Sequence, residues 1–340
     1  MPERPRLTPA VADVRRAVRA SLADLAQGGP AQGDPAQGEL VFVALSGGAD
    51  SLALAAATAF EAPRAGLTAG AVVVDHGLQP GSADVAAATA AAATALGLAP
   101  VVVRRVEVGV DGGPEAAART ARYAALEAVA AETGAVAVLL GHTLDDQAET
   151  VLLGLARGSG PTSLQGMDAA SGRWRRPLLA VRREATRASC ADLGLTPWDD
   201  PHNDDPSYAR VRVRTTVLPV LERELGPGVA EALVRTAAQL REDSAALDHF
   251  AEEQAEEVAD HAEAGISLDV RSLASNPAAL RQRLIRLAVE SEFAVTLSRA
   301  QTLEVARLVT DWHGQGAVSL PGVTVVRTGG ALHFAATAAS

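Results

Sequence analysis

The most informative polar segment follows an apolar run over residues 40–45, and it is Ser46-Gly47-Gly48-Ala49-Asp50-Ser51. Two glycines let the backbone approach a ligand, and the free N–H groups of a following helix favour an anion. Ser46 and Ser51 add hydroxyl donors. Asp50 would repel phosphate directly, so it is better suited to a Mg²⁺ ion that holds pyrophosphate. A plain strand-to-helix turn is the alternative, but the whole segment at a strand end favours a nucleotide site.

Three acidic residues and a histidine form a second group, near a helix expected from about residue 144. They are His142, Asp145, Asp146 and Glu149. Asp145 and Glu149 are four apart and share a helix face, and acids at this end suit the helix dipole. Helix capping needs only one acid, which we expect to be Asp145, and the other carboxylates suit a cation. His142, at a strand end, can be structural or functional.

The composition excludes several classes of protein. All 30 basic residues among the 340 are arginine, and this lack of lysine excludes a Walker A loop and Schiff-base lysine chemistry. The single cysteine, Cys190, excludes an intramolecular disulfide framework and a cysteine-ligated iron–sulfur cluster, and we expect a small buried hydrophobe. The formal net charge of −11 argues against nucleic-acid binding through the net charge of the whole chain. A local basic face can still bind nucleic acid.

Four apolar runs, each followed by a helical pattern, must position these side chains. The runs cover residues 40–45, 71–74, 101–103 and 135–140. Apolar strands that alternate with helices are parallel strands buried on both faces, so we predict a doubly wound, Rossmann-like α/β sheet. Ligands bind at the carboxyl ends of such strands, which is where Asp75, His76 and Gly141 stand.

The pattern changes after about residue 215, and we expect a domain boundary near residue 225. The first domain, 1–225, includes a small repeat of Ala, Gln, Gly and Pro over 26–39 that we interpret as a flexible insertion. The second domain, 226–340, is expected to be smaller and mainly helical and to end in a β-hairpin. Its expected helices cover 227–262, 277–290 and 298–311.

The sequence has no uncharged apolar run of about 20 residues and no basic-then-apolar leader. We therefore expect a cytoplasmic protein that does not enter a membrane.

The phosphate segment resembles the SGGxDS loop of the ATP-pyrophosphatase (N-type, PP-loop) superfamily, whose members cleave ATP between its α- and β-phosphates and need no lysine in the loop. Further segments resemble one family of that superfamily, the tRNA(Ile)-lysidine synthetases. In chain order they are Val74–Leu78, Glu115–Tyr123, Gly141–Thr150 with its H-x-x-D-D-Q-x-E-T signature, Arg176–Leu179 and Asp200–Pro219, and then, less specifically, Trp312–Gln315 and Leu320–Gly322. The resemblance covers about residues 40–225.

The resemblance implies the adenine nucleotide α-hydrolase type of fold and a two-step ligation. ATP adenylylates the C2 oxygen of the wobble cytidine in the CAU anticodon of an isoleucine tRNA, and the ε-amine of L-lysine then displaces AMP. The implied cofactors are ATP and Mg²⁺, and the implied partners are this tRNA and lysine.

The resemblance also implies residue roles. The nucleotide would bind Ser46, Gly47, Gly48, Ala49, Asp50, Ser51, Asp75, His76, Arg119 and Gly141, with Asp50 as the Mg²⁺ ligand. Lysine would bind Asp146 and Glu149, and the catalytic set would be Asp50, His142, Asp146 and Glu149. Arg119 has an alternative, which is an ion pair with Glu115 on the same helix.

Two groups of arginines are candidates for contact with tRNA. Arg210, Arg212 and Arg214 alternate, and on an extended segment all three would point to one side, so we expect the tRNA contact there. The other group is Arg173, Arg175, Arg176, Arg182, Arg183 and Arg187, of which we expect Arg182 and Arg183 to be solvated. Val211 stands where the family usually has asparagine, and this puts a polar contact at that position in question.

Two other functions stay open at this point. A tRNA thiolase of the same superfamily is one, although such enzymes commonly use paired cysteines and this chain has one cysteine. A non-catalytic nucleotide-binding module with an acidic helical docking surface is the other. Release of pyrophosphate from ATP separates an enzyme from a binding module.

Overall fold

A computed structural model describes residues 7–27, 38–77, 79–109, 113–158, 160–201, 205–262 and 265–337. Its contacts divide the chain into two compact units. The N-terminal unit consists of residues 1–157 and 166–236, and the C-terminal unit consists of 158–165 and 237–340. Most of the expected insertion, and His202 in the Asp200–Pro219 segment, lie outside the described residues.

The N-terminal unit is built on a six-stranded sheet with the order β3-β2-β1-β4-β6-β5. All neighbours pair in parallel except β5 and β6, so the predicted doubly wound parallel sheet is confirmed. The strands are β1(Leu40–Ala44), β2(Thr68–Asp75), β3(Val101–Arg105), β4(Ala137–Leu139), β5(Ala170–Ser171) and β6(Trp174–Arg175).

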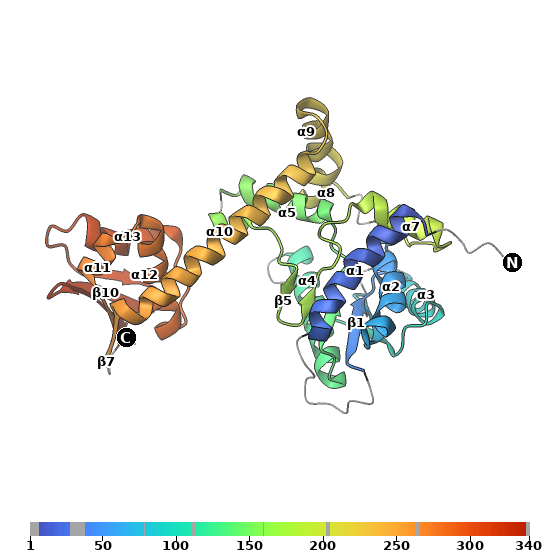
Figure 1. Cartoon of the computed structure of the whole chain (residues 1–340), viewed down its shortest axis with the longest axis horizontal. Helices are drawn as coiled ribbons and strands as arrows, with labels where there is room; N and C mark the ends of the chain where they lie inside the picture. Colours follow the sequence, from blue (N-terminus) through green and yellow to red (C-terminus); the bar gives the residue numbers. More distant parts are fainter. Residues whose placement is uncertain are drawn as a thin grey trace. The chain divides into compact units, whose positions relative to one another are not determined.

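Both faces of this sheet are buried, as the apolar runs require. Val41 and Val43 contribute to a core with α1(Pro9–Gln27), α2(Ala49–Glu61), α3(Ser82–Ala95) and α7(Arg183–Asp192). Phe42 and Ala44 point the other way, into a core with α4(Pro114–Thr133). This alternation follows from the strand geometry, in which successive side chains face opposite sides. Figure 1 shows α1 and α2 beside β1.

Further helical elements of the N-terminal unit pack against one another. They are α5(Leu144–Ala156), α8(Ala209–Arg212), a π-helical turn η3(Val213–Val217) and α9(Leu218–Leu225). Leu144 and Ala148 of α5 pack with Val213 and Leu218 in a small core. The segment around Arg210–Arg214 is therefore helical, and the extended conformation expected for it is wrong.

The helix α10(Val229–Val258) begins in the N-terminal unit and ends in the C-terminal unit. The predicted boundary near residue 225 lies at the end of α9, whereas the compact units divide after Thr236, inside α10. The short helix α6(Pro161–Leu164) also counts with the C-terminal unit.

The C-terminal unit packs α11, α12, α13 and the end of α10 on an antiparallel sheet with the order β7-β8-β11-β10-β9. The predicted terminal hairpin is confirmed as β10 and β11, and it belongs to this larger sheet. The elements are β7(Ala259–Ala262), β8(Gly265–Asp269), β9(Val318–Leu320), β10(Val323–Thr328), β11(Ala331–Ala336), α11(Val270–Ser275), α12(Ala278–Phe293) and α13(Arg299–Thr310). In the described chain, no helix combines the length and the apolar character that a membrane span needs.

Candidate active site

The phosphate loop connects β1 to α2, as the sequence predicts. Gly47 has a φ of +86°, and a Cβ atom there would lie 2.7 Å from Oγ1 of Thr89, so glycine is needed at this position. The Ser46 N–H donates to Oγ of Ser51 at 3.2 Å, and the Ser51 hydroxyl donates to the Gly48 carbonyl at 2.9 Å. These bonds hold a tight turn at the N-terminus of α2, which can receive an anion.

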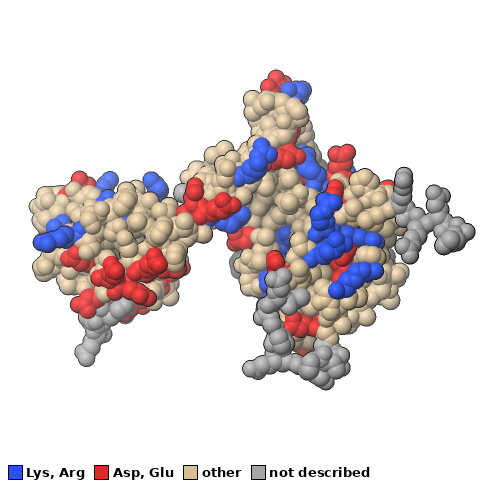
Figure 2. Space-filling view, in the orientation of Figure 1, with Lys and Arg blue, Asp and Glu red and all other residues tan. Residues whose placement is uncertain are grey.

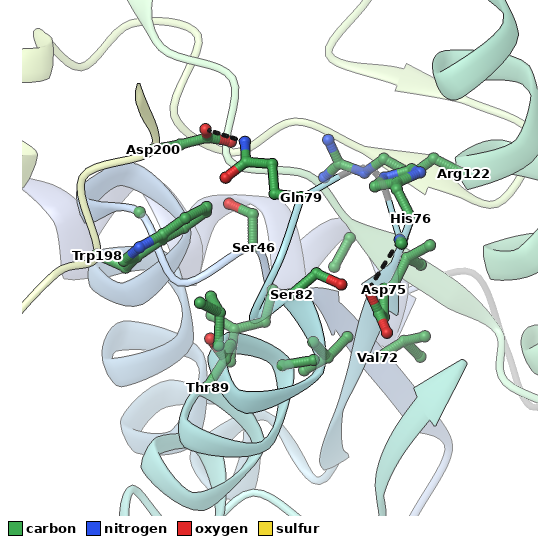
Figure 3. Close-up of a pocket in the computed structure, with 18 of the residues that line it drawn as sticks. Ser46, Val72, Asp75, His76, Gln79, Ser82, Thr89, Arg122, Trp198 and Asp200 are labelled. Atoms are coloured by element: carbon green, nitrogen blue, oxygen red, sulfur yellow. Dashed lines mark hydrogen bonds between the residues drawn. The ribbon is translucent and has the colours of Figure 1, made fainter. Parts of the chain in front are cut away.

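A cavity of about 510 Å³ lies at the carboxyl ends of β1 and β2 (Figure 3). It is lined by Ser46, Asp75, His76 and the ring of Trp198, whose backbone N–H donates to the Gly47 carbonyl at 3.0 Å. The Gly77 N–H donates to Asp75 at 2.9 Å and lowers the pKa of that carboxyl. Burial lowers the pKa of His76. The cavity has the position expected for a nucleotide in a doubly wound sheet.

The arginine of α4 that reaches this cavity is Arg122, not Arg119. Arg119 is exposed, and its guanidinium lies over the ring of Tyr123 with Cζ 4.9 Å from the ring centroid. Arg122 lines the cavity, and Figure 3 shows its side chain beside that of His76. The side chain of Glu115, the alternative partner of Arg119, lies outside the description. The contacts of Arg119 do not support the role in the nucleotide site that we expected for it.

A second cavity, of about 730 Å³, shares Ser46, Gly48, Arg122 and Trp198 with the first. The rest of its wall brings together most of the chemistry predicted from the sequence. It includes Asp50, Ser51, Gly141, His142, Asp146, Arg183, Arg187, Cys190 and Arg214. The two groups of polar residues singled out in the sequence therefore meet at one edge of the sheet.

Asp146 and Glu149 lie together on α5, where three arginines bind them. Glu149 has no exposed surface and accepts hydrogen bonds from Arg183 at 3.1 Å, Arg210 at 2.8 Å and Arg214 at 2.9 Å. Asp146 accepts from Arg183 at 2.8 Å and from Arg210 at 3.2 Å. Burial opposes the charge of Asp146, but Arg183 and Arg210 hold its pKa below the ordinary value. We call these five residues the carboxylate–arginine cluster.

Arg210 and Arg214 thus turn inward, four residues apart on a helical segment. Arg212 points elsewhere, is exposed, and donates to the carbonyls of Pro206 and Ser207 at 2.7 Å each. The three arginines do not form one face, because a helix separates side chains that an extended strand would align. Of the expected tRNA contacts, only Arg212 keeps an outward position. Val211 is buried.

Arg183 is the least expected member of the cluster. Its side chain is only 16% exposed, and it also pairs with Asp50, at 3.5 Å. Burial disfavours its charge, but Asp146 and Glu149 outweigh burial and raise its pKa. The expectation that Arg183 is solvated is wrong, because α7 packs beside α2 and carries its first side chain into the site.

Asp50 is engaged on both oxygens, by the hydroxyl of Thr186 and by Arg183. Burial raises the pKa of Asp50 more than these two partners lower it. The described residues contain no group of three His, Cys, Asp or Glu side chains that could hold a metal ion. Asp50 is the acidic residue of the Ser46–Ser51 loop, and the described side chains around it do not form a cation cage by themselves.

The capping roles of the two aspartates are the reverse of the expectation. Asp146 forms the capping box of α5 with Thr143, whose N–H and hydroxyl each donate to Asp146 Oδ2 at 2.8 Å. Asp145 accepts the Arg183 N–H at 2.7 Å and so caps the N-terminus of α7. Sequence spacing could not show this second contact, because α7 comes 38 residues later.

His142 lines the second cavity beside Asp146. Burial, with help from nearby Arg122, lowers its pKa to about 3, so the imidazole is neutral at neutral pH. Its Nδ1 is buried and has no hydrogen-bond partner among the described residues. A neutral ring with an open nitrogen is suited to a hydrogen bond with a ligand, and not to an ion pair.

Trp198 and Thr186 were not predicted from the sequence as site residues, and neither was Arg122, although it lies within the Glu115–Tyr123 segment. Thr186 touches Asp50, and Trp198 packs over the phosphate loop. The sequence offered one signal for Trp198, a large ring among the polar residues that follow Pro197 in a chain with 3% aromatic residues. Cys190 is buried, as expected, and burial raises the pKa of its thiol to about 11.

Comparison with known proteins gives one family match in each of two parts of the chain. A PP-loop domain family matches residues 19–221, and a TilS substrate binding domain family matches residues 268–333. The tRNA(Ile)-lysidine synthase of Leifsonia xyli subsp. xyli is 67% identical over 87% of this chain and 89% of its own length. That of Salinispora tropica is 54% identical over 96% of each chain.

A solved structure shares the fold. The U34-tRNA thiolase NcsA from Methanococcus maripaludis, with its [4Fe-4S] cluster, matches 68% of this chain and 80% of its own at a TM-score of 0.54 and 19% identity. That likeness concerns architecture only, whereas the sequence matches extend over nearly the whole chain. The chain belongs to the tRNA(Ile)-lysidine synthase family.

Proposed function

We propose that this chain joins L-lysine to C2 of the wobble cytidine in the CAU anticodon of an isoleucine tRNA, with ATP converted to AMP and pyrophosphate. Residues 1–225 would carry the chemistry, and residues 226–340 would contribute to tRNA binding. One observation carries the proposal: two cavities share the phosphate loop, and one has the strand-end position of a nucleotide site while the other has in its wall Asp146, the carboxylate that we assign to the lysine ammonium. A tRNA substrate implies a cytoplasmic location.

In the first step, the cytidine C2 oxygen would attack the α-phosphate of ATP, and pyrophosphate would leave. The N-terminus of α2, with the hydroxyls of Ser46 and Ser51, would stabilise the charge on the departing group. Mg²⁺ bound to the phosphates would neutralise more of that charge, with Asp50 as its protein ligand. Trp198 and Thr89, which line the first cavity, would hold the nucleoside part.

In the second step, the lysine ε-amine would attack C2 and AMP would leave. The amine must lose its proton before it can attack. Asp146, in the wall of the second cavity, would hold the incoming ammonium, with Glu149 behind it. His142, which stays neutral, would donate or accept a hydrogen bond at the substrate.

Thiolation is not the reaction that the site supports. A cysteine-ligated [4Fe-4S] cluster needs several thiolates, and this chain has one cysteine, which is buried.

The test uses the purified chain with ATP, lysine and an isoleucine tRNA transcript that has a CAU anticodon. We expect release of one pyrophosphate per modified tRNA, and a mass increase at the wobble nucleotide that equals lysine minus water. Asp50→Ala should lose pyrophosphate release and keep the fold. A methionine tRNA transcript is the matched control and should not be modified. A chain that binds ATP but releases no pyrophosphate would be a binding module.

A further inference from the structure

The carboxylate–arginine cluster has no free carboxylate oxygen that could accept a hydrogen bond from a substrate ammonium. Every oxygen of Asp146 and Glu149 accepts hydrogen bonds: Asp146 Oδ2 from Thr143, and the other three oxygens from arginines. Two carboxylates face three guanidinium groups, so an ammonium would enter as a fourth cation beside two anions. One arginine must move before lysine can bind at this position.

Arg183 is the arginine of the cluster that has alternative partners outside it. Arg210 and Arg214 reach only the α5 carboxylates among the acidic residues that the structure describes, whereas Arg183 also pairs with Asp50 of the phosphate loop. It lines the second cavity together with Ser46, Gly48 and Ser51, where the phosphates of ATP would lie. A guanidinium forms strong, charge-assisted hydrogen bonds with phosphate oxygens.

The backbone of Arg183 is anchored while its side chain is long. The Arg183 N–H donates to the Asp145 carboxylate at 2.7 Å, which holds the first residue of α7 in place. Movement of the guanidinium therefore needs rotation about side-chain bonds only, without displacement of α7. A bound triphosphate brings several negative charges to the loop, and these compete directly with Asp146 and Glu149 for this cation.

We propose that Arg183 makes lysine binding depend on ATP: its guanidinium covers Asp146 and Glu149 in the free enzyme, and bound triphosphate draws it away so that the lysine ammonium can replace it. This inference rests on the proposed function. The dependence is reciprocal, because lysine must raise the affinity for ATP by the same factor as ATP raises the affinity for lysine. It also keeps the amine out of the site until the activating nucleotide is present.

The experiment measures binding of radiolabelled lysine to the full chain by equilibrium dialysis, with and without α,β-methylene-ATP, which cannot release pyrophosphate. We expect the nucleotide to raise the lysine affinity at least tenfold. Inorganic pyrophosphate with Mg²⁺ should reproduce part of the increase, and adenosine should have no effect. Equal lysine affinity with and without nucleotide, or an increase with adenosine alone, would overturn the proposal.

The variant that tests the residue is Arg183→Gln. It should bind lysine more tightly than the wild type when nucleotide is absent, and the effect of the nucleotide should shrink to less than twofold. The neighbouring Arg182→Gln is the matched control: Arg182 is 40% exposed, pairs with Asp145 and Glu231, and should leave the tenfold effect intact. If Arg183→Gln weakens lysine binding equally in both states, Arg183 is only structural and the proposal fails.

Two further measurements distinguish a failure of this proposal from misfolding of the Arg183 variant and from a failure of the proposed function. Arg183→Lys keeps the positive charge and should retain part of the nucleotide effect, with a thermal unfolding midpoint near that of the wild type. If the wild type forms lysidine but shows no coupling, this inference fails and the proposed function stands. If the wild type forms no lysidine, the proposed function itself fails.

Discussion

His142 shows how burial decides the charge of a single side chain. Its pKa is lowered to about 3 in the folded chain, whereas a histidine in an unfolded chain has a pKa of about 6.5. Between these two pH values, the unfolded chain binds a proton that the folded chain does not bind. The stability that comes from keeping His142 neutral is complete above about pH 6.5 and is lost progressively below it.

We therefore expect the free energy of unfolding to fall between pH 7.5 and pH 5, by up to about 1.4 kcal/mol per pH unit below pH 6.5. Urea unfolding at several pH values measures this slope. His142→Gln should flatten it, although His76, whose pKa is also lowered, should leave a residual slope. An unchanged slope in His142→Gln would show that His142 is protonated in the folded state.

The phosphate loop contains two adjacent glycines, Gly47 and Gly48, which it needs for different reasons. A Cβ atom at Gly47 would meet Thr89 at 2.7 Å from a backbone with positive φ, whereas at Gly48 the nearest atom would be 3.8 Å away and φ is −70°. We expect Gly47→Ala to cost about 1–3 kcal/mol of stability. Gly48→Ala should unfold like the wild type but bind ATP more weakly, because a methyl group would lie where phosphate approaches.

Thermal unfolding and ATP binding, measured on both variants, separate the two effects. Equal stability of the two variants would contradict the assignment of strain to Gly47.

The N-terminus of α7 depends on a carboxylate from another helix. Asp145 accepts the Arg183 N–H, so Asp145→Ala should lower stability by about 1 kcal/mol and slow the reaction, because α7 carries Arg183 and Thr186 to Asp50. Asp145→Asn keeps an acceptor oxygen and should lie within a few tenths of a kcal/mol of the wild type. Urea unfolding measures the stability of both variants, and steady-state kinetics measures their rates. An equal loss of stability in Asp145→Ala and Asp145→Asn would mean that the charge of Asp145 matters and its capping hydrogen bond does not.

The strands β1 to β4 of the first sheet were predictable because local apolar patterns specify them, whereas the two-residue strands β5 and β6 were not predicted. Each apolar run became a strand, although Val103 of the edge strand β3 is 48% exposed, and the loop at Ser46–Ser51 stands where a buried strand ends. The conformation around Arg210–Arg214 was not predictable in this way, since alternating arginine and valine suits a strand. Long-range partners on α5 favour the helix instead, because it brings Arg210 and Arg214 to Glu149.

The strands β7 and β8 were missed for a related reason. They are short, and β8 is stabilised by pairing with β11, which comes more than 60 residues later in the chain. The carboxylate–arginine cluster is equally non-local: the acids of α5 looked free for a cation because their arginine partners lie 34 to 65 residues further along.

The charge of the whole molecule poses a problem for tRNA binding. A net charge of −11 repels tRNA at long range, with a screening length of about 10 Å at 0.1 M salt. In the view of Figure 2, acidic side chains gather on part of the C-terminal unit, which also carries basic side chains, and a group of basic side chains lies on the N-terminal unit. Local clusters of arginine must therefore supply the attraction.

Arg212 is the one arginine of its segment that points outward, so we expect Arg212→Ala to raise the tRNA Michaelis constant and leave ATP affinity unchanged. The slope of log affinity against log salt should flatten by about 0.7–0.9 if one phosphate contact is lost. Filter binding at several salt concentrations checks this. If the slope stays the same, the basic stretch Arg173–Arg187 is the next candidate.

The cations that surround Asp146 and Glu149 are all guanidinium groups. A guanidinium stays protonated and its electrons are delocalised, so it is a poor nucleophile, whereas an amine in the same place could attack an activated cytidine. This chain has no lysine at all, so no side chain of the enzyme offers an amine that could become attached to the tRNA. The choice of arginine thus protects the reaction from self-modification, because the side-chain amine transferred can only be the one that the substrate brings.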